Sequence, residues 1–195
     1  MHRFVMSVAR FMALLGGVTL GAMILIIGVS ILGRALNDFL HSAVAETLLG
    51  DAARGLIDMG IGAIRGDFEL VEALMAFTIF AFMPLTQMTG GHAAVDVFTS
   101  WMKGRGDRIL KAFIEVLFAV VFVIIAWQLK EGMDSRIRSG QTTLLLQFPV
   151  WWPYAASLFG AIITALVAIY HAGVRVVELI TGQSIAQDDE LGAEH

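Results

Sequence analysis

Four long apolar stretches limit most strongly what this chain can fold into. Residues 11–33, 73–91 and 139–170 contain no Asp, Glu, Lys or Arg, and residues 109–129 contain only Lys111 and Glu115, near their start. A hydrocarbon core about 30 Å thick is crossed by roughly 20 helical residues. The sequence therefore predicts one membrane domain over residues 1–195, an all-α integral membrane bundle of four transmembrane helices. The expected spans are about 11–33, 70–89, 109–129 and 151–171.

The segment between the first two spans is too long for a tight turn. Over residues 42–59, a helical wheel separates an apolar side from a polar side. This pattern predicts a short amphipathic helix in the membrane interface, although a helix that covers the bundle or a partner would have the same pattern. The apolar side holds Val44, Leu48, Ala52, Leu56 and Met59, and the polar side holds Thr47, Asp51, Arg54 and Asp58.

The chain ends and the loop charges bear on orientation. Residues 183–195 include four acidic side chains and predict a mobile acidic tail. With both termini inside, seven Lys and Arg residues fall on cytoplasmic segments and six on the opposite side. The first span and the basic cluster at 103–111 favour both termini in the cytoplasm. Trp127, Trp151 and Trp152 mark the other interface with lipid, where amphipathic rings are favoured.

Small residues recur at four-residue steps on two of the spans. Gly17 and Gly21 form a GxxxG pattern in the first span, and Gly160 and Thr164 belong to a longer strip in the fourth. Helices in lipid associate through close backbone approach, so both strips are predicted packing faces. Their partners are either other spans of this chain or helices of another subunit.

The sequence offers little for catalysis or cofactor binding. It has no cysteine, and no ionisable residue falls securely at the middle of a predicted span. Hydrolase and metalloprotease motifs are absent, and no basic surface for nucleic acid is evident. We therefore expect no enzyme activity, no cofactor, no metal site and no nucleic-acid partner. The stretch GGHAAVDVF, residues 90–98, places His92 and Asp96 four residues apart, on one face of a helix.

The order of several motifs resembles one transporter family. GGHAAVDVF after the second span and QTTLLLQFPVWWPY, residues 141–154, before the fourth are similar to the DctQ-like small membrane subunit of tripartite ATP-independent periplasmic (TRAP) transporters. Members have an arginine just past the first span and acidic residues that lead into the second. The matching positions are Arg34, Glu69, Glu72, Gly90, His92, Asp96, Thr142, Thr143, Leu146, Pro149, Trp151 and Trp152.

The resemblance implies a subunit that does not carry a substrate alone. In such systems a periplasmic solute-binding protein captures an organic acid, and a large multi-span membrane subunit moves it with a sodium gradient. The small subunit would lie in membrane lipid beside the large one and would be required for uptake. His92 and Asp96 would then sit at the cytoplasmic interface, where they cap a helix or tie the loop between spans two and three to the bundle or to the large subunit. Arg34 would either reach the headgroups or pair with Glu69 or Glu72.

Two other classes of protein stay open at this point. An autonomous homo-oligomeric channel or carrier would line a shared path with Glu115 and Gln128. A haem- or quinone-binding membrane anchor would need facing histidines in the bundle, and only His92 and His171 lie near span ends.

Overall fold

The computed structural model describes residues 2–42, 47, 50–58, 60, 62–89 and 105–181. Four of its helices are long and apolar enough to cross a membrane. The predicted fold class, an all-α membrane protein with four transmembrane helices, is therefore confirmed. The helices are α1 (His2–Leu40), α3 (Asp51–Asp58), α4 (Asp67–Met88), α6 (Arg105–Ser139) and α7 (Trp151–Thr181).

The spanning helices extend beyond most of the predicted limits. α1 has 39 residues and α6 has 35, which at 1.5 Å per residue gives lengths of about 58 Å and 52 Å. Both exceed a hydrocarbon core of about 30 Å. Charged residues marked the edges of the predicted spans, but a charge at the headgroups does not stop a helix. α6 ends where the chain reaches Gly140, whose φ of +60° is a conformation that favours glycine.

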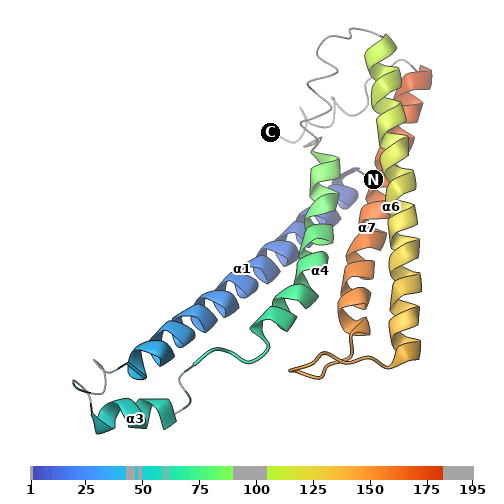
Figure 1. The fold of residues 1–195 in the computed structure, drawn as a ribbon. Coiled ribbons are helices and arrows are strands. Elements are labelled where there is room, and N and C mark those ends of the chain that lie inside the picture. The colour runs from blue at the N-terminus through green and yellow to red at the C-terminus, as the bar shows by residue number, and fades with distance from the viewer. Residues whose placement is uncertain are drawn as a thin grey trace.

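The helices form two antiparallel pairs (Figure 1). α1 packs against α4, α6 packs against α7, and the contact between α4 and α7 joins the pairs. The start of α1 and the end of α7 lie at the same end of the bundle, whereas α3 and the loop between α6 and α7 lie at the opposite end. α1 is steeply inclined to α6, so the two pairs diverge toward the end that carries α3.

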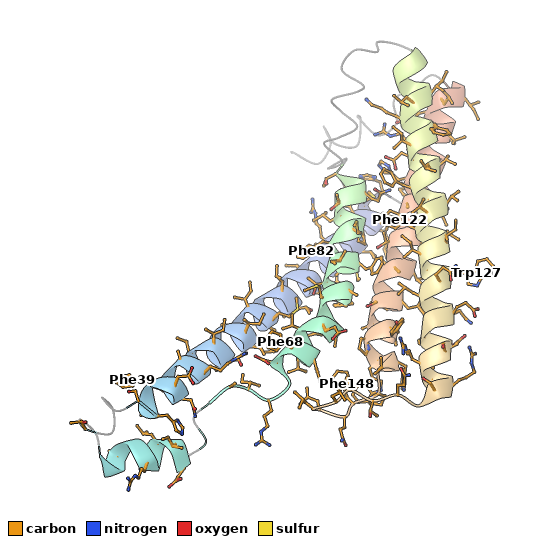
Figure 2. The ribbon with its side chains drawn as sticks, viewed as in Figure 1. Phe39, Phe68, Phe82, Phe122, Trp127 and Phe148 are labelled. Atoms are coloured by element: carbon orange, nitrogen blue, oxygen red, sulfur yellow. The ribbon has the colours of Figure 1, made fainter. Side chains whose placement is uncertain are left out.

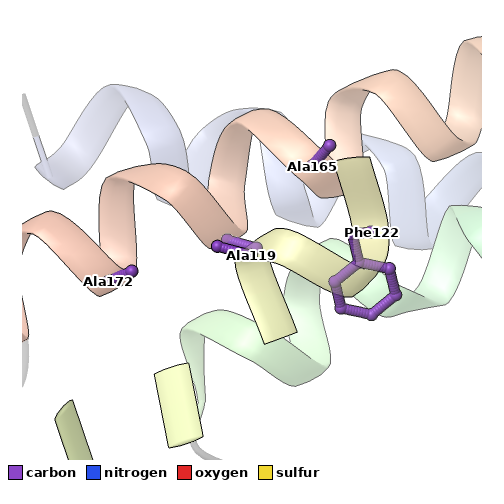
Figure 3. Close-up of a cluster of buried hydrophobic side chains, with 5 residues drawn as sticks. Ala119, Phe122, Ala165 and Ala172 are labelled. Atoms are coloured by element: carbon purple, nitrogen blue, oxygen red, sulfur yellow. The ribbon is translucent and has the colours of Figure 1, made fainter. Parts of the chain in front are cut away.

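α7 is the central helix. Half of its most apolar stretch is buried, compared with 17% in each of the other three long helices. Its small side chains let the neighbouring helices approach closely. In Figure 3, Ala119 and Phe122 of α6 lie against the helix that carries Ala165 and Ala172. The outer surfaces remain apolar, and Trp127 points away from the bundle with 66% of its surface exposed (Figure 2).

The loop between α6 and α7 folds back on itself over residues 141–150. The backbone N–H of Thr143 donates to the carbonyl of Phe148 at 3.0 Å, and that of Val150 donates to the carbonyl of Gln141 at 3.0 Å. α7 begins at Trp151, directly after this turn and two residues beyond Pro149. Pro149 pairs with Thr142 in an isolated bridge, and the Phe148 ring stacks on Trp152 with centroids 6.3 Å apart.

Candidate functional site

A first polar contact joins α1 to α4 and is formed by Ser30, Arg34 and Asp67. We call this contact the Arg34 junction. The Asp67 side chain is 8% exposed and forms an ion pair with Arg34. The Ser30 hydroxyl donates to Asp67 Oδ2 at 2.6 Å, and it accepts hydrogen bonds from Arg34 and from the backbone N–H of Ile64, each at 3.2 Å. One hydroxyl supplies one donor and two acceptor positions, so Ser30 is fully used. The junction fixes the end of α1 against the start of α4.

The expected ion pair of Arg34 with Glu69 or Glu72 is wrong, because the acidic partner is Asp67. Residues on a helix turn by about 100° each, so Glu69 and Glu72 project roughly 160° and 140° away from Asp67 and do not face α1. Asp67 also lies in the first turn of α4, where the helix dipole favours a negative charge. The second span was predicted to begin at residue 70, so Asp67 was not identified as the partner of Arg34.

Glu69 connects α4 to the 141–150 loop instead. Its two carboxylate oxygens accept the backbone N–H groups of Leu145 and Leu146 at 2.8 and 2.9 Å. The Leu146 side chain packs directly on Gly66, which has a φ of +76°; a Cβ there would lie 2.5 Å from Leu146 Cγ. Glu69 and Gly66 together hold the loop against the start of α4. Glu72 is exposed and lines a pocket beside this contact.

A second polar contact joins three helices at the other end of the bundle. We call this contact the Glu115 junction. Glu115 of α6 lies 3.3 Å from His171 Nδ1 of α7 and accepts a hydrogen bond from Gln87 Nε2 of α4 at 3.4 Å. The side chains of His171 and Glu115 are only 7% and 13% exposed. Polar groups between membrane helices need such partners. The sequence placed Glu115 two turns inside a span and His171 near a span end, but no spacing along the chain shows that they meet.

Of the two predicted small-residue faces, one contacts another helix of this chain and the other faces open space. Gly160 lies in the contact between α7 and α4, where an added Cβ would be 2.9 Å from Phe80 Cβ. The Thr164 hydroxyl lies 3.1 Å from the carbonyl oxygen of Phe80 across the same contact. Cβ atoms at Gly17 and Gly21, in contrast, would meet nothing within 4 Å. The glycine of α1 that faces α4 is Gly16, beside Ala81 and Phe82.

Several predicted features lie outside the described residues. His92 and Asp96 fall in residues 90–104, and the acidic tail falls in residues 182–195. Of the predicted amphipathic helix, α3 accounts for Asp51–Asp58, while Val44, Leu48 and Met59 are not described. Its position in the membrane interface stays a prediction. Within the described residues, no group of three or more His, Asp or Glu side chains is arranged to hold a metal ion.

The fold and these contacts define a class of protein. It is a multi-pass membrane protein in which four of the described helices can span the membrane, and the polar side chains of the Arg34 and Glu115 junctions join its own helices to one another. Such an arrangement suits a membrane component that holds a fixed shape, since each junction joins different helices.

The family comparison gives the identity within that class. The family described as "Tripartite ATP-independent periplasmic transporters, DctQ component" matches residues 57–180, which run from α3 to the end of α7. The chain belongs to this family, so it is a small membrane subunit of a transporter and not an enzyme. A search of curated proteins and a search of solved structures gave no match.

Proposed function

We propose that this chain is the small permease subunit of a sodium-driven TRAP transporter for an organic acid. It lies in the bacterial inner membrane with both termini in the cytoplasm and packs against the large membrane subunit. That subunit moves the acid after a periplasmic solute-binding protein has delivered it. Membership of the DctQ family supports this assignment, and the arrangement of polar groups in the bundle supports a structural role in uptake.

The supporting observation is that the described charged and amide side chains that join one helix to another meet in two separate junctions. The other buried polar side chains among the described residues are the hydroxyls of Thr78, Ser157 and Thr164, and Glu178, which pairs with Arg175 of its own helix. Ser30, Arg34 and Asp67 meet where α1 ends and α4 begins, and the Glu115 junction lies toward the opposite end. Between them, α4 and α7 are in contact through small side chains, with Gly160 directly on Phe80. A solute path would need polar groups along its length. Two closed junctions with a packed contact between them instead stabilise one relative position of the helices.

The described part of the chain gives no specific support to the alternative of an autonomous channel. That alternative requires Glu115 and Gln128 to line one path. Glu115 is enclosed by Gln87 and His171, whereas Gln128 is exposed. Thirteen residues separate them, which places Gln128 roughly 140° around α6 from Glu115.

We assign the contact with the large subunit to the face of α1 that carries Gly17 and Gly21. Gly28 lies on the same face, and a Cβ at any of the three would meet nothing within 4 Å. Small residues in lipid permit close approach of a second helix, and no described side chain of this chain fills the space. His92 and Asp96 keep the proposed role at the cytoplasmic interface. Trp151 and Trp152 would anchor the opposite end at the headgroups.

Reconstitution tests the assignment. Liposomes that contain this chain and the large subunit should accumulate a carboxylate only with the loaded binding protein and an inward sodium gradient. Liposomes that contain this chain alone should accumulate none. Uptake by the chain alone, or full uptake by the large subunit without it, would contradict the proposal.

A matched pair of variants tests the contact surface. Gly17→Leu should lower co-purification of the large subunit about tenfold, because a bulky side chain prevents the close approach. Gly173→Leu is the control, since Gly173 also has open space at its Cβ position but lies on α7. Equal losses in the two variants would show that the effect is not specific to the α1 face.

A further inference from the structure

A pocket of about 500 Å³ lies at the end of the bundle that carries the 141–150 loop. Its walls come from the start of α4, the later part of α6, the loop and the first turns of α7. Figure 2 shows Phe148, one of the lining residues, in this loop at the base of α7. Leu129, Phe148 and Tyr154 contribute apolar surface, and Glu69, Glu72 and Ser157 contribute polar groups. The proposed structural role does not require such a space.

Ser157 is the most informative group in the pocket. The residue is 2% exposed, and its hydroxyl forms no hydrogen bond within the described part of the protein. A buried hydroxyl without a partner is unfavourable, and native structures rarely contain one without a reason. Because Ser157 lines the pocket, a ligand bound there can supply the missing hydrogen bond.

The charges of the pocket select the sign of that ligand. Glu69 accepts two backbone N–H groups, which leave its negative charge unneutralised. Neither Glu69 nor Glu72 forms an ion pair with a described residue, and the lining contains no Lys or Arg. The nearby Arg136 lies over the Tyr154 ring at 5.9 Å and donates to the side chain of Gln141. The pocket therefore attracts a cation and repels an anion.

We propose that this pocket binds a primary ammonium group attached to an apolar chain. An ammonium has three N–H donors and no acceptor, which fits a site of two carboxylates and a hydroxyl. The Phe148 ring adds a favourable surface for a cation, and the apolar lining accommodates the attached chain. A metal ion fits less well, because the described residues contain no group of three or more His, Asp or Glu ligands. The ethanolamine headgroup of a phospholipid and a free alkylamine share the required chemistry.

Calorimetric titration of the full chain in a neutral maltoside detergent tests the site. n-Hexylamine, protonated at pH 7, is the probe, and n-hexanol is its neutral counterpart of the same chain length. Hexylammonium should bind at least about tenfold more tightly than hexanol, since a charge-assisted hydrogen bond is stronger than a neutral one. Glu72→Gln should weaken hexylammonium binding about tenfold, and Ser157→Ala about threefold. Glu131→Gln, an exposed acid of α6 outside the lining, should leave binding unchanged.

A second titration separates the two sources of the ammonium group. Phosphatidylethanolamine added to the micelles should compete with hexylamine, whereas phosphatidylcholine should not, if the natural ligand is the lipid headgroup. Retained hexylamine binding without such competition assigns a free amine. Equal affinity for hexylammonium and hexanol would overturn the proposal, as would unchanged binding in Glu72→Gln. Because Glu72 is exposed, that variant tests the ligand without disturbing the bundle.

Discussion

The contact of α7 with α4 at Gly160 gives the sharpest prediction about stability. An added Cβ at Gly160 would lie 2.9 Å from Phe80 Cβ, 3.5 Å from Phe80 C and 3.7 Å from Ala81 N. Two carbon atoms are in favourable contact at about 3.5–4.0 Å. In the variant Gly160→Ala, the two helices must therefore separate by roughly 0.6 Å or more at this point. The Phe80 atoms belong to or adjoin the backbone, so no flexible side chain can absorb the shift.

The free-energy cost follows from that separation. Overpacking by one methyl group destabilises a core by typically about 1–3 kcal/mol. The same shift would move the Thr164 hydroxyl beyond hydrogen-bonding distance of the Phe80 carbonyl, now 3.1 Å away, and leave it bonded only to the Gly160 carbonyl of its own helix, 2.9 Å away. Loss of this contact between the helices adds a cost of about 0.6 kcal/mol. The higher helix propensity of alanine offsets about 1 kcal/mol. Gly160→Ala should therefore lower the free energy of unfolding by about 0.6–2.6 kcal/mol.

Unfolding in mixed micelles, with increasing mole fraction of dodecyl sulfate and helix content as the signal, measures this loss. Gly17→Ala is the matched control, because its Cβ meets nothing within 4 Å; it should be no less stable than the natural chain. Thr164→Val should destabilise the Gly160→Ala variant less than it destabilises the natural chain, since the helix separation has already broken the contact between Thr164 and the Phe80 carbonyl. Equal stability of Gly160→Ala and Gly17→Ala would refute the packing argument.

Three further outcomes are expected. A double-mutant cycle in the same micelles should show coupling between Arg34→Gln and Asp67→Asn but none between Arg34→Gln and Glu72→Gln, and the reverse result would contradict the observed ion pair. Glu115→Leu should destabilise the bundle by about 1–3 kcal/mol, because it removes the carboxylate that accepts from Gln87 and lies 3.3 Å from the buried His171 Nδ1, and an unchanged unfolding curve would rule out this junction. His92→Ala should reduce complex stability or uptake while membrane insertion, measured by fractionation, stays normal; normal assembly and uptake would contradict its proposed role.

The four helices could be predicted because a bilayer permits little else. A long apolar run without charge must cross as a helix that satisfies its own backbone hydrogen bonds. The packing face around Gly160 and Thr164 could also be predicted from the sequence, since several small residues at four-residue steps leave one face of α7 free for close contact. Helix ends were harder to place, because charged residues at the headgroups mark the edge of the lipid and not the end of the helix. α1 accordingly continues to Leu40, beyond Arg34.

The pairings between helices could not be predicted from the sequence. Gly16 and Gly17 differ by 100° around α1, yet only Gly16 faces α4. Which of them is buried depends on the rotation of the helix, and contacts along its whole length determine that rotation. The same holds for Asp67 with Arg34 and for His171 with Glu115. Each pair is separated by more than thirty residues in sequence, and no local pattern records that they meet.

The structure separates residues that stabilise the bundle from residues available to a partner. Thr164 and Asp67 bind neighbouring helices of this chain, whereas Gly17 and Gly21 face open space. If the subunit acts as a fixed support, substitutions in the two groups of residues should have different effects on stability and on partner binding. Thr164→Val and Asp67→Asn should lower the unfolding free energy and, with it, uptake. Gly17→Leu should lower co-purification of the large subunit about tenfold while the unfolding curve of the isolated chain stays unchanged, because a Cβ at this position meets no atom of its own bundle within 4 Å. Loss of bundle stability in Gly17→Leu would place that face inside the chain's own fold and would remove it as the surface for the large subunit.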